Sequence, residues 1–412
     1  MTWSPELPDR SPAVERPARP PLLVAAFTTV NALGAGTQAS LVALRQGSSG
    51  LRRCDYADAD LPTWIGRVAG VEDAPVTGPL SAYDCRNNRL AQMGLSEDGF
   101  SAAVAAARAR YGPDRIGVFV GTSTSGIAHT EDAYRRRDAA GRLPDDFDYR
   151  CTHDVFSVAD FTRQSLGLTG ITLAISTACS SSAKVFAAAE RHIRAGVCDA
   201  AVVGGVDSLC LTTLYGFRAL ELTSPAPCRP WDAGRDGLSL GEAAGFALLR
   251  PAEPGETGLA LLGAGESSDA YHMTAAHPEG AGAALAMRRA LDRAGLQPEQ
   301  IDYINLHGTA TPSNDRSEDR AVVEVFGNAV PCSSTKGWTG HTLGAAGIIE
   351  AVFCFLALVH GFIPGTLNTN TPDPQLAAAL QLDTCERAVR TVVSNSFGFG
   401  GTNCSLVFGR LG

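Results

Sequence analysis

A cysteine between a short apolar run and a helix-forming stretch is the residue of this chain best placed to act as a nucleophile. Residues 171–175 predict a buried strand, Cys179 follows in the turn 176–182, and residues 180–195 predict a helix that ends at Gly196. Backbone N–H groups at a helix N-terminus and the helix dipole favour a thiolate. Since the thiolate is the reactive form, Cys179 is a candidate for covalent catalysis.

Two histidines lie in similar turns further along the chain. His307 directly follows the apolar run 301–306, and His341 closes the segment 334–341, which also contains Lys336. An imidazole can donate or accept a proton near neutral pH. A free cysteine is ordinarily an inert core residue, and these two histidine motifs are what favour catalysis over packing for Cys179.

Strands and helices alternate along most of the chain, with polar turns at the strand ends. The first half predicts strands at 22–27, 115–121, 171–175, 200–205 and 242–249, and helices at 38–45, 86–93, 100–110 and 180–195. The second half predicts strands at 258–265, 301–306, 391–396 and 404–408, and helices at 282–294, 317–326 and 344–359. This pattern predicts two similar α/β halves, each a mixed sheet covered by helices.

The halves are placed at residues 22–257 and 258–412. Residues 1–21 carry six prolines among charged and small residues, which predicts a flexible tail. Residues 127–150, which are polar and charged, predict an irregular surface excursion.

Composition excludes several classes of protein. A net charge of −9 argues against bulk binding of nucleic acid or anionic membranes. The 11 cysteines form no C-x-x-C pair and show no metal-ligand spacing, which predicts a reducing compartment and no structural metal. No apolar run is expected to span a membrane, and residues 22–30 predict a strand rather than a signal peptide. We therefore expect a cytoplasmic protein.

Four segments carry the resemblance to a known family: residues 176–182, 306–312 with Asp315 just after, 334–341 and 395–403. In this order they resemble the elongating β-ketoacyl-acyl carrier protein synthases of the thiolase-like superfamily, over about residues 22–410. The resemblance implies a thiolase-like fold with α-β-α-β-α layering and no cofactor. It also implies a decarboxylative Claisen condensation of an acyl-enzyme with malonyl carrier protein, which releases 3-ketoacyl carrier protein, carbon dioxide and free carrier protein.

The resemblance also implies roles for individual residues. Cys179 would accept the acyl group, and His307 and His341 would hold the malonyl thioester through Nε2. The backbone N–H groups of Cys179 and Phe399 would stabilise the oxyanion. Glycines on both sides of Phe399 let that backbone turn and move, so Phe399 is also the candidate gate of the acyl pocket.

Further residues are expected to support the catalytic group or to contact substrate. Lys336 would tune the histidines and pair with Glu350. Thr309 and Thr311 resemble the positions that bind the pantetheine arm. The remaining candidates for substrate contact are Phe397, Thr124 and Asp315, of which Thr124 resembles a position lining the acyl pocket.

Partners follow from the same resemblance. Acyl carrier proteins are acidic, so a local basic surface is expected; its candidates are Arg52 and Arg53, Arg135–Arg137 and Arg150. The family forms dimers, and this chain is expected to pair with itself or with a related ketosynthase or chain-length factor. Residues 81–89 resemble ketosynthases of aryl polyene pigment clusters, and the bulky Trp338 is expected to reshape the site or an interface.

Alternative functions are less well supported by the residues. A chain-length-factor-like partner subunit lacks the nucleophile, whereas Cys179 is present here. An acyltransferase that does not condense needs no histidine pair. Initiating synthases resemble a Cys-His-Asn set, and thiolases use a second cysteine. The hydrolase pattern G-x-S-x-G occurs at 237–241, but a loop precedes it and a strand follows, which is the wrong context for a nucleophile elbow.

Overall fold

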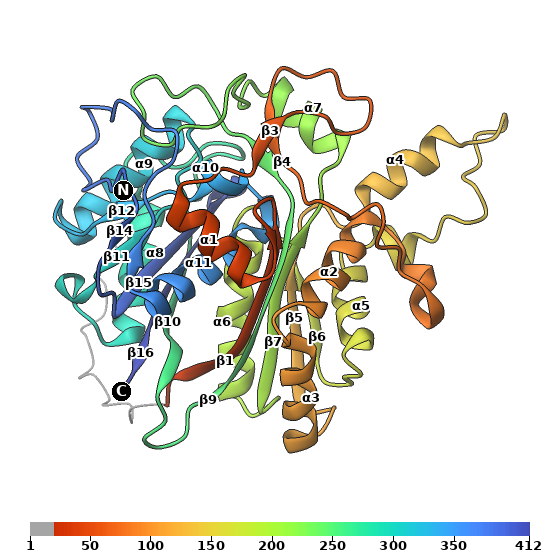
Figure 1. Cartoon of the computed structure of the whole chain (residues 1–412), viewed down its shortest axis with the longest axis horizontal. Coiled ribbons are helices and arrows are strands. Elements are labelled where there is room, and N and C mark those ends of the chain that lie inside the picture. The colour runs from red at the N-terminus through yellow and green to blue at the C-terminus, as the bar shows by residue number, and fades with distance from the viewer. Residues whose placement is uncertain (1–19) are drawn as a thin grey trace, which may run out of the picture.

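The computed structural model describes residues 20–412, in which a long mixed sheet is covered by helices on both faces (Figure 1). The tail predicted at 1–21 lies outside the described residues, apart from its last two prolines. The strands that follow one another along the long sheet are, in the first half, β1 (Leu22–Asn31), β5 (Ile116–Gly121), β6 (Thr172–Ile175), β7 (Ala200–Asp207) and β9 (Ala243–Pro251). Those of the second half are β10 (Gly258–Ser268), β11 (Tyr303–Asn305), β12 (Cys332–Ser333), β15 (Thr391–Gly398) and β16 (Thr402–Leu411).

The two halves share one topology. The sheet order is β12-β11-β15-β16-β10-β1-β9-β7-β5-β6. When the strands of each half are numbered in chain order, both halves read 3-2-4-5-1 from the outer edge inward. In each half the strands numbered 3, 2 and 4 are parallel to one another, and strand 5 is antiparallel to both of its neighbours, strands 4 and 1. The prediction of two similar halves with mixed sheets is therefore confirmed.

The halves meet where β1 pairs with β10, through Leu22 with Leu261 and Leu23 with Ala260. The predicted boundary at 257/258 falls in the connection between β9 and β10. Shorter strands are β2 (Gly34–Ala35), β3 (Leu51–Arg53), β4 (Trp64–Gly66), β8 (Leu240–Gly241), β13 (Phe362–Ile363) and β14 (Cys385–Glu386).

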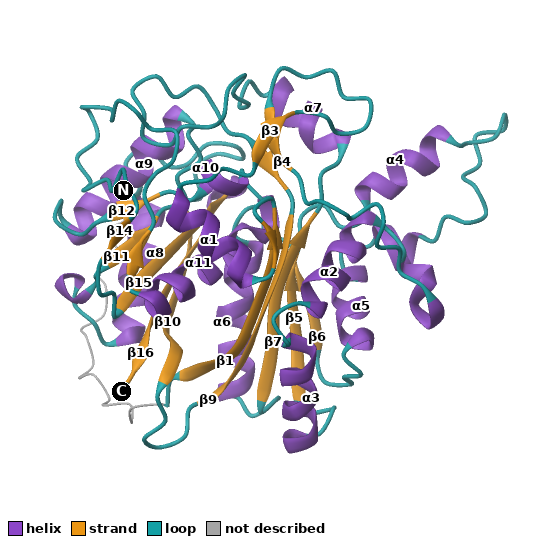
Figure 2. Ribbon diagram, in the orientation of Figure 1, coloured by secondary structure: helices purple, strands orange, loops and turns teal. Residues whose placement is uncertain are grey.

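Helices form three layers, one between the strands of the two halves and one on the outer side of each half (Figure 2). The central layer holds α6 (Ser181–Arg194) and α11 (Ala346–His360), which contact each other and strands of both halves. The outer layers hold α2 (Arg86–Ser96), α3 (Phe100–Tyr111) and α5 (Ser157–Ser165) on one side, and α8 (Ala281–Ala294) and α9 (Pro312–Phe326) on the other. The remaining helices are α1 (Thr37–Gln46), α4 (Ile127–Arg135), α7 (Leu211–Ala219) and α10 (Lys336–Thr339).

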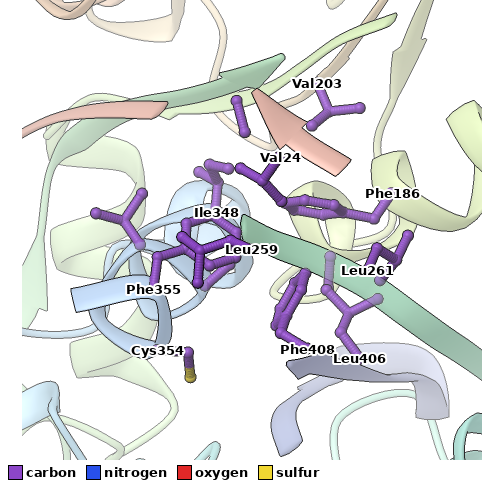
Figure 3. Packing of buried hydrophobic residues seen from close by; sticks show 14 of the residues in the cluster. Val24, Phe186, Val203, Leu259, Leu261, Ile348, Cys354, Phe355, Leu406 and Phe408 are labelled. Carbon is purple, nitrogen blue, oxygen red and sulfur yellow. The ribbon is translucent and has the colours of Figure 1, made fainter. Parts of the chain in front are cut away.

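The core lies between the central helices and the sheet. Figure 3 shows Phe186 of α6 and Ile348 and Phe355 of α11 packed with side chains from β1, β7, β10 and β16. The two central helices approach closely because a glycine stands at the contact. A Cβ atom at Gly347 would lie 2.4 Å from the backbone nitrogen of Ala183. This close contact fixes the N-terminal end of α6, where the candidate nucleophile lies.

Helix α11 corrects one expectation. The helical stretch Leu343–His360 is long and apolar enough to cross a membrane, although no such run was expected, and 89% of it is buried inside the protein. Its apolar character follows from its central position, where strands or helices cover every side. A buried core helix satisfies the same length and composition test as a membrane span.

Other differences from the sequence prediction are local. The excursion at 127–150 begins with a regular helix, α4, which projects from the body of the molecule (Figure 1). Helix α9 begins at Pro312 rather than Ser317, since proline at the first helical position is already set to the helical φ. Strand β6 is half-buried rather than buried, because it lies at the edge of the sheet.

Candidate active site

Cys179 lies in a tight turn between β6 and α6. Ala178 adopts a left-handed φ of 53°, and the backbone N–H of Thr177 donates to the hydroxyl of Ser181 at 2.9 Å. A Cβ atom at Gly121 would lie 2.4 Å from the nitrogen of Ser182, so β5 and the start of α6 fit only with a glycine there. These contacts hold the Cys179 side chain in a buried position, 5% exposed.

His341 is positioned by the segment 239–241. Its N–H donates to the carbonyl of Ser239 at 2.7 Å, and its own carbonyl accepts from the N–H of Gly241 at 2.9 Å. This segment is the G-x-S-x-G pattern of the sequence, in which Ser239 is fully buried. Its role here is to hold the backbone of His341, whose Nε2 lies 3.0 Å from the sulfur of Cys179.

His307 follows β11 and is held from two sides. The N–H groups of His307 and Gly308 each donate to a different oxygen of Glu318, both at 2.8 Å. Lys336 donates to the carbonyl oxygen of His307 and approaches its ring Nδ1 at 3.4 Å. The rings of His307 and His341 stand nearly perpendicular, at 85°, with centroids 5.2 Å apart.

Burial dominates the electrostatics of this group. It raises the pKa of the Cys179 thiol to about 11, against the opposing effect of the Lys336 ammonium and the backbone N–H groups of Phe399 and Cys179. Burial, with the nearby Lys336 ammonium, lowers the pKa values of His307 and His341 well below the usual range. The helix N-terminus at Cys179 favours the thiolate, as the sequence predicts, while burial acts in the opposite direction and raises the pKa of the thiol.

The resting site thus holds a neutral thiol beside neutral imidazoles. At 3.0 Å the thiol of Cys179 can donate to Nε2 of His341, which can take the proton when the sulfur attacks. Lys336 offers a proton to Nδ1 of His307, which leaves the ring proton of that histidine on Nε2, as a donor.

A cleft leads to these three residues. Its lining includes Thr309, Thr311 and Phe397 among the candidates for substrate contact, and also Phe399 and Phe217. The hydroxyls of Thr309 and Thr311 lie 2.9 Å apart. The ring of Phe397 lies 5.9 Å from that of His307, between centroids.

Thr124 and Asp315 do not line this cleft. The hydroxyl of Thr124 donates to the buried carboxylate of Asp207 at 2.8 Å. The carboxylate of Asp315 is fully buried and accepts from the N–H groups of Trp231 and Ala310. Burial raises the pKa of Asp315 to about 6. Both side chains bind loops around the cleft.

Trp338 also lies away from the cleft. It is buried, and its indole N–H donates to the carbonyl of Ala43 in α1 at 3.3 Å. Lys336, two residues earlier, forms a buried ion pair with Glu350 of α11.

The cysteine sulfur and the two histidine rings present ligand atoms within 4.8 Å of one another. Thiolate and imidazole are the ligands that zinc prefers in proteins. The same three groups that could react with a thioester could therefore also be occupied by zinc.

Sequence reasoning missed three residues that shape the site. Glu318 orients the backbone of His307, Asp207 ties the loop 122–124 to the turn after His341, and Phe217 of α7 stacks on Phe399. The sequence does give one indication of Glu318, because it is a carboxylate at the start of the helix predicted after His307. Nothing in the local sequence marks Asp207 or Phe217.

Comparison with known families places these motifs in context. The model of the β-ketoacyl synthase N-terminal domain matches residues 90–254, and that of the C-terminal domain matches residues 260–370. The chain is 33% identical to 3-oxoacyl-[acyl-carrier-protein] synthase 2 of Vibrio harveyi, over 95% of this chain and 98% of that protein. It is 43% identical to the mitochondrial 3-oxoacyl-[acyl-carrier-protein] synthase of Arabidopsis thaliana, over 60% of this chain and 58% of that protein.

A similar solved structure is the complex of the ketosynthase ApeO with its chain length factor ApeC from Xenorhabdus doucetiae. A chain of that complex superposes with a TM-score of 0.86 at 37% identity, over 95% of this chain and 98% of that one.

Proposed function

The chain belongs to the β-ketoacyl synthase family of the thiolase-like superfamily and is a β-ketoacyl-acyl carrier protein synthase, and we propose that Cys179, His307 and His341 carry out its condensation. The observation that carries this proposal is the 3.0 Å contact between Nε2 of His341 and the sulfur of Cys179. His307 stands perpendicular to His341 on the same cleft. A chain-length factor without a nucleophile would need none of this geometry.

In the first half-reaction Cys179 attacks the thioester carbonyl of an acyl carrier protein. The thiol proton passes to Nε2 of His341 and then to the departing thiolate of the carrier arm, so that free carrier thiol and acyl-Cys179 are formed. The backbone N–H groups of Cys179 and Phe399, which already lower the pKa of the thiol, stabilise the oxyanion of the tetrahedral intermediate.

In the second half-reaction malonyl carrier protein occupies the emptied cleft. The bond to its carboxylate breaks, carbon dioxide leaves, and the electron pair forms an enolate. Once Cys179 is acylated, no thiol donates to His341, and its single ring proton can move from Nδ1 to Nε2. The Nε2–H groups of His307 and His341 then donate to the thioester oxygen on which this charge develops. The enolate carbon attacks the acyl carbonyl and expels the Cys179 thiolate, which takes up a proton from water. The buried pair Lys336–Glu350 keeps His307 in the donating tautomer.

The direct test is a condensation assay with purified protein, acyl carrier protein and malonyl carrier protein. We expect 3-ketoacyl product and an acyl adduct visible by intact mass, both lost in Cys179→Ala. Replacement of the more distant Cys228, which is buried behind Lys336, by serine serves as the control and should keep the adduct. Carrier binding without adduct or product in the unaltered protein would contradict the proposal.

We propose that the carrier protein docks over the mouth of the cleft. Arg218 follows Phe217 on α7, and Arg316 lies close to Asn314 on α9; Phe217 and Asn314 line the cleft. Both arginines are exposed and have no ion-pair partner among residues 20–412. These two cations flank the entrance and suit an acidic partner.

Three of the six basic residues expected from sequence are already paired. Arg135 pairs with Asp58, Arg136 with Asp132 and Asp146, and Arg52 with Asp55. Reversal of charge at Arg218 and Arg316 should weaken carrier binding more than reversal at Arg135 and Arg136. Equal effects would move the docking site to α4.

A second subunit is proposed to pair along β6. This strand is an edge of the long sheet, and its half-buried side chains and the neighbouring Ile171 are apolar apart from Thr172. An unpaired edge is a natural site for strand addition. Light scattering of the protein alone and after co-expression with a related subunit would distinguish a self-paired dimer from a mixed one, and a monomer in both would contradict pairing.

We propose an aryl polyene or related conjugated acyl chain as the substrate, on the basis of the sequence of residues 81–89. Within this segment Tyr83 and Asn88 bind Asp160 and Ser157 of α5, so their role in the fold is to pack α2 against α5. Competition between carrier proteins loaded with saturated acyl chains and carrier proteins loaded with conjugated acyl chains tests this proposal.

The eleven free cysteines are consistent with the proposed cytoplasmic location.

A further inference from the structure

We propose that Phe217 of α7 is a positioning residue that holds the ring of Phe399 in place and thereby sets which acyl chains reach Cys179. This inference rests on the proposed function and on the sequence-based expectation that Phe399 is the gate of the acyl pocket. It adds a specificity determinant on a helix that the sequence did not predict.

The two rings form a stacked pair inside the cleft. Their centroids lie 5.5 Å apart and their planes differ by 28°. Both residues line the same cleft as Cys179, although they come from different elements, α7 and the turn between β15 and β16. Stacked aromatic rings attract each other beyond their burial, so each ring is a restraint on the other.

The two sides of this pair differ in mobility. Phe399 is followed by Gly400 and Gly401, both with positive φ, at 79° and 72°. A Cβ atom at Gly400 would meet nothing within 4 Å, so this part of the turn is surrounded by open space. The backbone of the turn is tied to residues 269–273 by two hydrogen bonds, from the N–H of Gly400 to the carbonyl of Met273 at 2.8 Å and from the N–H of Asp269 to the carbonyl of Gly401 at 2.9 Å. Movement of the turn must break these bonds, whereas the ring of Phe399 is held by contact with Phe217.

Phe217, in contrast, stands on an anchored helix. Leu214, one turn earlier, is fully buried in a cluster with Leu209, Leu238 and Leu240. Glu131 of α4 accepts hydrogen bonds from the first N–H groups of α7, those of Leu211 at 3.0 Å and Thr212 at 2.6 Å. A carboxylate at a helix N-terminus stabilises that end, so α7 presents a fixed ring to a movable one.

Movement of Phe399 has a chemical consequence. The backbone N–H of Phe399 lowers the pKa of the Cys179 thiol, and both residues line the same cleft. If the ring leaves Phe217 to admit an acyl chain, the attached backbone moves with it. The N–H of Phe399, which is proposed to stabilise the oxyanion, then changes position. The stack thus links admission of the chain to the geometry of the reacting group. Loss of a stacked pair of this kind should lower the ratio of molecules with Phe399 held against Phe217 to molecules with Phe399 displaced about two- to tenfold.

The test compares Phe217→Leu with Phe217→Tyr. Leucine keeps an apolar side chain but removes the stack, whereas tyrosine retains it. Tyr215→Ala on the exposed side of α7 is the matched control, since Tyr215 does not line the cleft. Two quantities are measured: the rate of iodoacetamide alkylation of Cys179 in the resting protein, and the ratio of acyl-transfer kcat/KM for long and short acyl carrier proteins.

We expect Phe217→Leu to raise the alkylation rate of Cys179 about two- to tenfold and to change the long-to-short ratio by a similar factor. Tyrosine should restore both, and the control should change neither. Unchanged alkylation and an unchanged ratio in a leucine variant with an unaltered melting temperature would overturn the inference. Alkylation needs no condensation, so a protein that labels as expected but forms no ketoacyl product would contradict the proposed function alone.

If Phe217→Leu does not fold, Glu131→Gln gives the second test. It weakens the anchor of α7 outside the cleft and should shift alkylation in the same direction by a smaller factor. An unchanged alkylation rate in a folded Glu131→Gln protein would then count against α7 as the support of the gate.

Discussion

Lys336 donates a hydrogen bond to the carbonyl oxygen of His307 and lies 3.4 Å from Nδ1 of the same residue. One buried ammonium therefore fixes both the backbone and the tautomer of a histidine. Its charge is balanced by Glu350, the only carboxylate that pairs with it in the described part of the chain. This arrangement makes Lys336 a positioning residue for His307.

Replacement of Lys336 by methionine should separate the two half-reactions. We expect decarboxylation of malonyl carrier protein to fall about 10²–10³-fold, as when one oxyanion donor is lost, because His307 is no longer held as a donor. Acylation of Cys179 should fall much less. The two rates are measured separately, by release of carbon dioxide and by intact mass.

Stability provides the control for this variant. A lone buried Glu350 should destabilise Lys336→Met by about 3–5 kcal/mol. The double variant Lys336→Met with Glu350→Gln should regain most of that stability without regaining decarboxylation. Recovery of both would show that Lys336 acts only through the fold.

The sequence predicts the three residues that the structure brings together, because each belongs to a local motif. Cys179 is marked by a strand-turn-helix pattern, and His307 and His341 by turns after apolar runs. The supports of these residues come from elsewhere in the chain. Ser239 holds His341 from about a hundred residues away, and local pattern carries no information about such contacts.

Burial is the second quantity that the sequence does not supply. The helix N-terminus at Cys179 is visible in the sequence and favours the thiolate, but the depth of the cleft determines the pKa, which rises to about 11. In the same way Thr124 and Asp315 occupy positions that resemble contacts with substrate, yet their polar atoms bind the protein itself. Side-chain direction decides their roles, and sequence position does not.

Asp207 should be important for both stability and activity. Its carboxylate accepts from Thr122, Ser123 and Thr124 on one side and from the N–H of Gly344, three residues after His341, on the other. An asparagine has one acceptor oxygen and adds two donors that face other donors. We expect Asp207→Asn to lower the free energy of unfolding by about 2–4 kcal/mol and to slow condensation.

Denaturation by urea measures that loss. The matched control is Asp199→Asn, which removes an exposed carboxylate paired with Arg115 and should change stability by less than about 1 kcal/mol. Equal effects of the two substitutions would contradict a structural role for the buried carboxylate.

Glu318 should give the protein a measurable pH dependence of stability. Burial raises its pKa to about 7 from 4.5, against the effect of the N–H groups of Gly308 and His307. The folded protein therefore holds this proton at pH values where the unfolded chain has released it. The contribution to stability is fully present below pH 4.5 and is lost as the pH rises toward 7.

In Glu318→Gln this group no longer titrates. Between pH 5 and 7 the unfolding free energy of the unaltered protein should fall with pH more steeply than that of the variant, by up to about 1.4 kcal/mol per pH unit. Parallel slopes in urea denaturation across this range would show that Glu318 is already ionised in the folded protein at pH 5.

Zinc should inhibit the free enzyme through the same atoms that react. The sulfur of Cys179 and the ring nitrogens of His307 and His341 lie within 4.8 Å of one another, and zinc must displace the thiol proton in order to bind. Because that proton is held firmly, inhibition should strengthen about tenfold per pH unit between pH 6 and 8. Prior acylation of Cys179 should protect the enzyme, and Mg²⁺ should have no effect because it prefers oxygen ligands. Inhibition that is equal in free and acylated protein would place the zinc elsewhere.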